Sequence, residues 1–318
     1  MRQFDVAVVG GGPAGIAAAT AAAGSGANTI LIDEHSKLGG QLRWRIGLTM
    51  DETAGLDVDS GPGPFVADSL DSALREADNL TVETGTVAWG LFEDNVLGIS
   101  AESSAEEVQA GAIILATGST DITLPFPGWT LPGVMTDRAA RIFMHVHRVL
   151  PGSRWGILGT GEEADELAAD LQRVGAEVVA RCDDPNQIRA SGTNRLAHIE
   201  IGENVYEADA LAIALGRQPD AELALHAQAT SAFVPELGGF TVHRDEHGRT
   251  SEPGVYIAGD AAGIGSLAEL VSEGRLVGLA VSGAGESALG QARQQVERVS
   301  SVRRADAIAG LRLTGTAV

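Results

Sequence analysis

Residues 6–34 contain the feature that most constrains the fold, a glycine-rich turn between an apolar segment and a run of small residues. The turn carries Gly10, Gly12 and Gly15 in the spacing G-x-G-x-x-G. The Ala-rich stretch after it predicts a helix, and the apolar residues 29–32 predict a second strand that ends at Asp33. This order of strand, turn, helix, strand and acid predicts the first βαβ unit of a parallel α/β sheet.

Each part of this unit has a physical role in holding a dinucleotide. Gly10 permits the tight turn, Gly12 lets the backbone approach a pyrophosphate, and Gly15 lets the helix pack closely on the strand. The helix N-terminus offers free N–H groups and a partial positive charge to phosphates. Asp33 is placed to accept a hydrogen bond from a ribose hydroxyl. We therefore expect a dinucleotide site here rather than a glycine turn that binds nothing.

Composition limits the other possibilities. A chain of 318 residues suggests about two domains, and 44% hydrophobic residues suffice for a sizeable core. The formal net charge of −21 argues against nucleic acid or an anionic membrane as a partner. No apolar run is long enough to span a membrane, and Asp5 and the glycine turn argue against a secretory signal. We expect a cytoplasmic protein.

The chain has a single cysteine, Cys182. It therefore cannot form an intramolecular disulfide, and several of its own cysteines cannot hold a cluster. Cys182 follows an apolar strand and is expected to be an ordinary strand-end residue. His145 and His147 lie on a predicted helix, but the i, i+2 spacing places them on different faces. We expect no metal site and assign no catalytic residue.

A second strand, turn and helix are predicted within residues 155–180. Gly159 and Gly161 repeat the first two glycines, and Ala164 takes the third position. Glu162 and Glu163 start the predicted helix, where acids stabilise the N-terminus but repel a pyrophosphate. We expect this segment to bind a nicotinamide nucleotide weakly or not at all. Nearby Arg181 and Arg189 are equally consistent with a 2′-phosphate contact and with solvated surface positions.

Three further stretches predict strands. Residues 80–100 alternate between apolar and polar residues and predict antiparallel strands with turns at Gly85 and Asn95. Residues 112–118 (AIILATG) and 255–263 (VYIAGDAAG) each predict a buried strand followed by small residues. Residues 238–250 predict a hairpin around Asp245–Gly248.

Together, the early G-x-G-x-x-G, the central ATG and the late strand ending in GD resemble the flavoproteins that have two dinucleotide-binding domains. The resemblance covers nearly the whole chain, with the three motifs in the right order. It implies an α/β fold of two Rossmann-like domains, the second inserted into a discontinuous first domain. Residues 1–125 and 238–318 would then form the FAD-binding domain, and residues 126–237 an inserted NAD(P)-like domain, which either binds NAD(P) or is degenerate as Glu162 and Glu163 favour.

The resemblance also implies which residues contact FAD. The first glycine turn would cradle the pyrophosphate and Asp33 would hold the adenosine ribose. The LGGQ turn would line the flavin side, Val87 would meet the adenine through its backbone, and Asp260 would bind the ribityl or pyrophosphate end. The full set of expected cofactor-binding residues is Gly10, Gly12, Pro13, Ala14, Gly15, Asp33, Glu34, Gly40, Gln41, Val87, Ala116, Thr117, Gly118, Gly259 and Asp260.

Two stretches narrow the resemblance within these flavoproteins. Residues 125–136 (PFPGWTLPGVMT) and 237–260 are similar to the FAD-binding chains of amine oxidoreductases that are built from several subunits. These chains include opine oxidase A, the alpha chains of sarcosine oxidase and of dye-linked proline dehydrogenase, and a chain of hydrogen cyanide synthase. The usual thioredoxin reductase mechanism is excluded because residues 118–160 contain no C-x-x-C pair.

The resemblance therefore implies an FAD-dependent oxidoreductase subunit whose enzyme oxidises amines or amino acids. A flavoprotein partner subunit would carry most of the substrate site. Many family members hold an iron–sulfur cluster in a cysteine-rich C-terminal segment, and residues 286–318 have no cysteine. A partner would supply that cluster, or the enzyme works without it. Two alternatives remain: a stand-alone NAD(P)H-dependent flavin or ferredoxin-type reductase, and a non-catalytic nucleotide-binding scaffold subunit.

Overall fold

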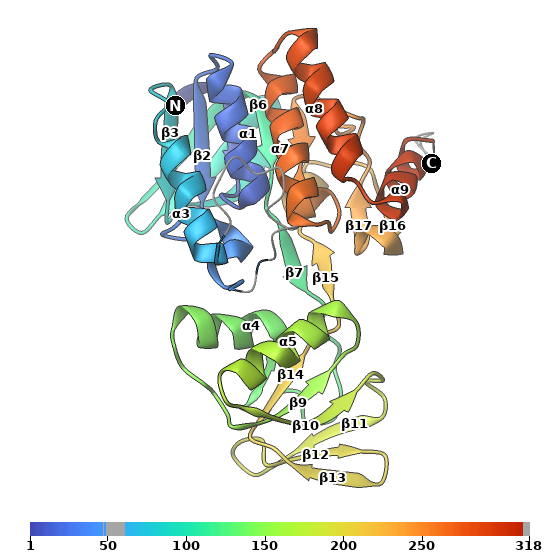
Figure 1. The fold of residues 1–318 in the computed structure, drawn as a ribbon. Helices are drawn as coiled ribbons and strands as arrows, with labels where there is room; N and C mark the ends of the chain where they lie inside the picture. The colour runs from blue at the N-terminus through green and yellow to red at the C-terminus, as the bar shows by residue number, and fades with distance from the viewer. Residues whose placement is uncertain (47, 49–60, 314–318) are drawn as a thin grey trace. The chain divides into compact units, whose positions relative to one another are not determined.

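The computed structural model describes residues 1–46, 48 and 61–313 (Figure 1). The chain divides into two compact units. Unit 1 contains Met1–Ser119 and Gln218–Val318, and unit 2 contains Thr120–Arg217. Both units are mixed α/β, and the second interrupts the first in the sequence. This is the fold of two Rossmann-like domains, one inserted into the other, that the motifs predicted.

Unit 1 is built on a seven-stranded sheet in the order β3-β2-β1-β6-β5-β4, with β18 paired to β6. The strands β1, β2, β3, β6 and β18 run parallel to one another, whereas β4 and β5 form a hairpin whose β5 pairs antiparallel with β6. The bounds are β1 (Arg2–Val9), β2 (Thr29–Asp33), β3 (Leu80–Thr84), β4 (Val87–Phe92), β5 (Val96–Ala101), β6 (Ser104–Leu115) and β18 (Val255–Ile257).

One strand of this sheet differs from the expectation for residues 80–100. β4 and β5 are antiparallel as predicted, with the turn at Asn95. β3, however, pairs parallel with β2. Alternation of apolar and polar residues reports a half-buried strand but not the direction of its partner. The direction follows from the chain entering β3 after helix α3 (Gly63–Leu74).

Small residues allow two helices of unit 1 to pack at close range. Helix α1 (Pro13–Gly24) contacts α7 (Leu267–Val281) along its length. A Cβ added at Gly274 would lie 2.1 Å from Ala14 O, and one at Gly278 would lie 2.2 Å from Ala18 O. These glycines therefore let α7 rest directly on the α1 backbone. The helices α8 (Glu286–Val299) and α9 (Val302–Leu313) follow α7.

Residues 218–237 belong to unit 1, although the sequence-based boundary assigned them to the inserted domain. This stretch contains α6 (Glu222–His226) and β16 (Ser231–Val234). Ala221, Ala224 and Ala229 are buried in the same core cluster as β1 and β6. β16 pairs antiparallel with β17 (Gly239–Val242), so β17 takes its partner from earlier in the chain and not from residues 245–250. The predicted turn at Asp245–Gly248 forms, because Gly248 N donates to Asp245 O (3.2 Å), but the predicted strand pairing within residues 238–250 is wrong.

Unit 2 has a four-stranded parallel sheet in the order β10-β9-β14-β8 and a three-stranded antiparallel sheet, β11-β12-β13. Its core surrounds the fully buried Trp155. The bounds are β8 (Val134–Thr136), α4 (Asp137–Arg141), β9 (Arg154–Leu158), α5 (Glu162–Arg173), β10 (Glu177–Cys182), β11 (Ile188–Ser191), β12 (His198–Ile201), β13 (Asn204–Glu207) and β14 (Ala210–Ile213). The chain passes between the units within β7 (Ser119–Asp121) and β15 (Arg217–Pro219).

Candidate functional site

The glycine turn after β1 contains two positions that only glycine can occupy. Gly10 has φ +104°, and a Cβ there would lie 2.2 Å from Ala116 O. A Cβ at Gly15 would lie 1.8 Å from Gly10 O. Both glycines are therefore required by the protein's own packing, as the sequence predicted for the tight turn and for the contact of helix with strand.

Gly12 differs from Gly10 and Gly15 because the packing of the protein does not require a glycine at this position. Its backbone is extended (φ −75°, ψ −179°), and an added Cβ would meet no protein atom within 4 Å. Gly12 is the N-cap of α1 and Pro13 occupies the first turn, so the free N–H groups of the helix start face the same region. The open space beside Gly12 is what a pyrophosphate against the backbone needs.

Asp33 lies at the carboxyl end of β2 and is 8% exposed. Its Oδ2 accepts a hydrogen bond from Gly11 N (2.5 Å), and its Oδ1 accepts one from His35 N (2.7 Å). This carboxylate therefore fixes the glycine turn through Gly11. The neighbouring Glu34 is exposed and its Oε1 lies 3.9 Å from His35 Nδ1.

The LGGQ turn lies against the glycine turn. Gly39 N donates to Gly11 O (2.7 Å), and a Cβ at Gly40 would lie 3.0 Å from Gly12 Cα. Gln41 connects the LGGQ turn to Asp260, because its Nε2 donates to Asp260 Oδ2 (3.2 Å). Residues 10–12 and 39–41 are therefore in direct contact.

Asp260 is the point where several distant segments meet. It is 4% exposed, in the short helix η5 (Gly259–Ala262) that follows β18. Its Oδ2 accepts hydrogen bonds from Gln41 Nε2 and Ser119 Oγ, both at 3.2 Å, and its Oδ1 accepts one from Gly265 N (3.2 Å). A Cβ at Gly259 would lie 2.5 Å from Ala14 Cβ, so η5 also packs on the start of α1.

The ATG segment contacts the same region through its backbone. Ala116 is buried with Ala14 and Leu270. Thr117 Oγ1 donates to the carbonyl of Asp220, and Asp220 N donates back to Gly118 O (2.9 Å). The Thr117 hydroxyl therefore ties the segment to residue 220. An added Cβ at Gly118 would meet no protein atom within 4 Å.

Val87 lies at the start of β4 and is 42% exposed. Its neighbour Thr86 donates its N–H to Asp33 O (3.0 Å). The structure therefore places the backbone before Val87 beside the end of β2. Together, the expected cofactor-binding residues of unit 1 gather at the carboxyl ends of β1, β2, β6 and β18, where ligands of open α/β sheets bind.

The second glycine turn differs from the first in backbone and in charge, since Gly161 has φ +83° where Gly12 has φ −75°. A Cβ at Gly159 would lie 1.9 Å from Ala214 O, whereas one at Gly161 would meet nothing within 4 Å. Glu162 is exposed, and Glu163 Oε1 lies 2.7 Å from Arg217 Nε. Arg217 therefore partly compensates the charge of Glu163.

The arginines considered for a 2′-phosphate contact both face acids in the structure. Arg181 Nη2 lies 2.7 Å from Asp165 Oδ1, and Arg189 Nε lies 3.8 Å from Glu200 Oε2. Both pairs lie within unit 2. A phosphate at either arginine would have to compete with the carboxylate.

A cluster of charged side chains lies beneath α4 in unit 2. Arg141 is 6% exposed; its Nε donates to Asp137 Oδ1 (2.8 Å) and its Nη1 donates to Asp170 Oδ2. Burial raises the pKa of Asp137 to about 6, against the opposing charge of Arg141. His145 is buried 3.4 Å from Asp170, whereas His147 is exposed, so the two histidines face different surroundings as predicted.

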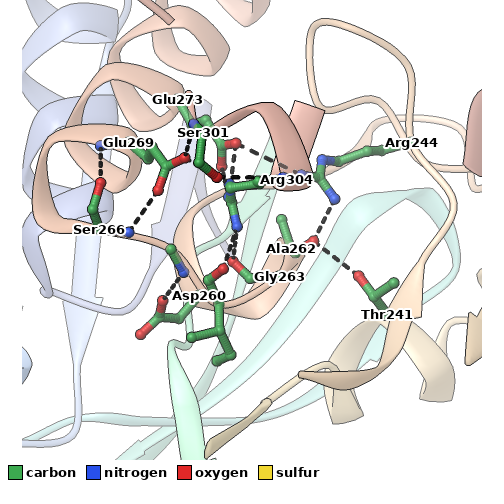
Figure 2. Close-up of polar contacts among 12 residues, drawn as sticks. Thr241, Arg244, Asp260, Ala262, Gly263, Ser266, Glu269, Glu273, Ser301 and Arg304 are labelled. Atoms are coloured by element: carbon green, nitrogen blue, oxygen red, sulfur yellow. Dashed lines mark hydrogen bonds and ion pairs between the residues drawn. The ribbon is translucent and has the colours of Figure 1, made fainter. Parts of the chain in front are cut away.

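Sequence reasoning missed two parts of the unit 1 site. Ser119 directly follows the ATG motif but carried no signal of its own. Arg304 was not among the expected site residues, yet it is 3% exposed and contacts the loop after Asp260 (Figure 2). A run of polar residues on a predicted helix does not reveal a single arginine that turns inward. Cys182 is buried at the end of β10. Within the described residues no group of His, Cys, Asp and Glu is arranged to hold a metal ion.

The parallel sheet, the glycine turn with its open side at Gly12, and the inserted second Rossmann-like unit define a protein of the two-dinucleotide-binding-domain fold. The chain belongs to the pyridine nucleotide-disulphide oxidoreductase family, whose model matches residues 4–189 and 183–284. No helix in the described part of the chain is both long enough and apolar enough to cross a membrane.

The chain is similar to subunits of larger oxidoreductases. It is 29% identical to opine oxidase A of Agrobacterium tumefaciens, over 87% of this chain and 65% of that protein. It is 30% identical to the sarcosine oxidase alpha chain of Rhizobium meliloti, over 85% of this chain and 29% of that protein. The chain thus spans less than two thirds of the length of these relatives.

A solved structure supports the same relationship. The L-proline dehydrogenase from P. horikoshii superposes with a TM-score of 0.81 at 27% identity, over 93% of this chain and 59% of that chain. The similarity therefore extends over both units of the chain.

Proposed function

We propose that this chain is the FAD-binding subunit of a multi-subunit dehydrogenase or oxidase that acts on the C–N bond of an amine or amino acid. The observation that carries the proposal is the open space at Gly12, in a turn where a Cβ at Gly10, Gly11 or Gly15 would meet other protein atoms. A glycine that the fold does not need is explained by a ligand that approaches the backbone there.

The residues that would hold FAD follow from this geometry. The backbone at Gly10, Gly12 and Gly15 and the N-terminus of α1 would bind the pyrophosphate, as helix starts bind anions. Asp33 would accept a hydrogen bond from a ribose hydroxyl while it keeps its hydrogen bond from Gly11 N. The remaining contacts would come from Glu34, Gly40, Gln41, Val87, residues 116–118, Gly259 and Asp260. When bound, FAD supplies the two-electron redox chemistry, and the protein supplies orientation and exclusion of water.

The substrate class rests on the relatives. Opine oxidase, sarcosine oxidase and L-proline dehydrogenase each take their name from a compound that contains a C–N bond. Disulphide reduction by a cysteine pair within this chain is excluded, because Cys182 is its only cysteine. We assign no residue of this chain to bond breaking, and we propose that a flavoprotein partner subunit supplies most of the substrate site.

Two further assignments complete the proposal. An iron–sulfur cluster, where the enzyme has one, would be held by a partner subunit. Unit 2 would be a degenerate NAD(P)-like domain, because Glu162 stands exposed at the start of α5, where a pyrophosphate would bind. A cytoplasmic location stays a prediction.

The test begins with the cofactor. The purified chain should bind about one FAD per chain, and Gly12→Val should prevent this. The flavin of the chain purified with its partner should then be reduced anaerobically by sarcosine, proline or an opine. A chain that stays colourless in excess FAD would contradict the proposal. Fast reduction of the chain alone by micromolar NADPH would favour the reductase alternative, and a flavin that no donor reduces would favour the scaffold.

A further inference from the structure

Arg304 is a buried arginine on α9, about forty residues after the loop that it contacts. Its side chain is 3% exposed in unit 1. Its Nη1 donates to Gly263 O (2.5 Å) and to Ile264 O (2.7 Å). Its Nη2 donates to both carboxylate oxygens of Glu273, each at 2.8 Å. One guanidinium therefore joins α9 to α7 and to the loop that leaves η5 (Figure 2).

The loop that Arg304 binds also donates a hydrogen bond to Asp260. Gly265 follows Ile264 directly, and its N–H donates to Asp260 Oδ1 (3.2 Å). The other oxygen of this carboxylate accepts from Gln41 and Ser119. The position of residues 263–265 thus decides whether Gly265 N reaches the Asp260 carboxylate. Figure 2 shows the side chain of Arg304, which comes from α9, beside Gly263, with Asp260 of η5 nearby.

Neighbouring charges keep Arg304 in place. Burial by itself lowers the pKa of Arg304, but the carboxylates of Glu273, Glu269 and Asp260 outweigh it and raise that pKa above its usual value. Glu269 is itself fixed, because Oε2 accepts from Ser266 N (2.7 Å) and Oε1 accepts from Ser301 N (2.9 Å). The guanidinium is therefore charged and surrounded by fixed acceptors, which is the strong class of hydrogen bond.

Ala262, which directly precedes Gly263, is bound by two other side chains of unit 1. Ala262 O accepts from Thr241 Oγ1 (2.8 Å) and from Arg244 Nη1. Arg244 Nη2 also lies 3.7 Å from Glu273 Oε1. Three consecutive carbonyls, those of residues 262–264, are thus bound by buried side chains from β17, the turn after it and α9.

We propose that Arg304 is a positioning residue for the cofactor: it fixes residues 263–265, and through Gly265 N it fixes the Asp260 carboxylate at the nucleotide site. Tight FAD binding therefore depends on α9, an element that makes none of the expected cofactor contacts itself. This inference rests on the proposed FAD site.

The test compares FAD affinity between Arg304→Met and a matched control, Arg298→Met. Arg298 is exposed on α8 and loses the same charge. Apoprotein of each variant is titrated with FAD by fluorescence quenching. We expect Arg304→Met to raise the Kd about tenfold or more, since charge-assisted hydrogen bonds are lost, and Arg298→Met to leave it unchanged. Arg304→Lys should be intermediate, because an ammonium keeps the charge but lacks the planar fork.

Two further variants separate positioning from loss of stability. Leu289→Ala removes a buried side chain from the α7–α8 cluster and should lower the melting temperature without changing the FAD Kd. Gly265→Ala places a methyl 3.0 Å from Arg304 Cζ and should weaken FAD binding in a chain that still folds, so it carries the test where Arg304→Met does not fold.

The outcomes distinguish a failure of this inference about Arg304 from a failure of the proposed FAD site on which it rests. A wild-type chain that binds no FAD would refute the proposed site, and the inference with it. A wild-type chain that binds FAD, together with an unchanged Kd in folded Arg304→Met or in Gly265→Ala, would overturn the inference alone. An equal loss of affinity in Leu289→Ala would also overturn it, because the effect would then follow stability.

Discussion

The two substitutions Gly12→Ala and Gly15→Ala should separate cofactor binding from folding, although the glycines are three residues apart. At Gly12 the backbone is extended and the added methyl meets no protein atom within 4 Å. At Gly15 the methyl would lie 1.8 Å from Gly10 O, 3.0 Å from Gly10 C and 3.4 Å from Ala116 Cβ. The same chemical change therefore meets open space at one position and backbone at the other.

The magnitudes follow from these contacts. Overpacking of a filled site costs about 1–3 kcal/mol, so Gly15→Ala should lower the stability of the apoprotein by at least that amount. Gly12→Ala loses some N-cap preference but reduces the freedom of the unfolded chain, so the net change should stay within about 1 kcal/mol. With FAD present, the Gly12 methyl competes with the ligand, and about 1–3 kcal/mol corresponds to a Kd about fivefold to 150-fold higher.

The assay is thermal unfolding of the apoproteins followed by FAD titration at a temperature where each variant is folded. Apoprotein is needed because bound ligand raises the melting temperature by mass action. We expect Gly12→Ala to melt with the wild type and bind FAD weakly, and Gly15→Ala to melt several degrees lower. A Gly12→Ala variant that binds FAD as tightly as the wild type would show that the open space is not the pyrophosphate site. An equal drop in melting temperature for both variants would refute the packing argument.

Three other predictions concern charges. Asp260→Asn should weaken FAD binding by about 1–3 kcal/mol, because the amide cannot accept from all three donors; an unchanged Kd by titration would contradict this. The wild-type chain should bind NADPH poorly by calorimetry, and Glu162→Gln should improve that affinity about tenfold, more than Glu163→Gln does, because Arg217 partly compensates Glu163. Asp137 has a folded pKa of about 6, above its ordinary 3.8, so it favours the folded state when protonated and its contribution is lost as the pH rises through 6. From about pH 5 to about pH 7.5 the free energy of unfolding should therefore fall about 1 kcal/mol more in the wild type than in Asp137→Asn, measured by urea denaturation; parallel pH profiles would exclude this role.

Local sequence determined the first βαβ unit. The spacing of Gly10, Gly12 and Gly15 and the acid at the end of β2 depend on backbone geometry over a few residues. Such constraints appear in the sequence wherever the turn forms. The apolar runs of β1, β2, β6 and β18 likewise report burial directly. The family resemblance rested on these signals together with other short motifs, such as residues 125–136, and the comparisons confirmed it.

Tertiary structure decided where the chain changes unit and which distant side chains meet. Residues 218–237 join unit 1 because their alanines pack into its core, and no local pattern distinguishes that core from the other. Gln41 and Asp260 are 219 residues apart, yet they share a hydrogen bond because β18 pairs with β6 and brings η5 to the start of α1. Arg304 faces this loop because α9 returns to α7. Sheet order and helix packing, which are global properties of the chain, set these contacts.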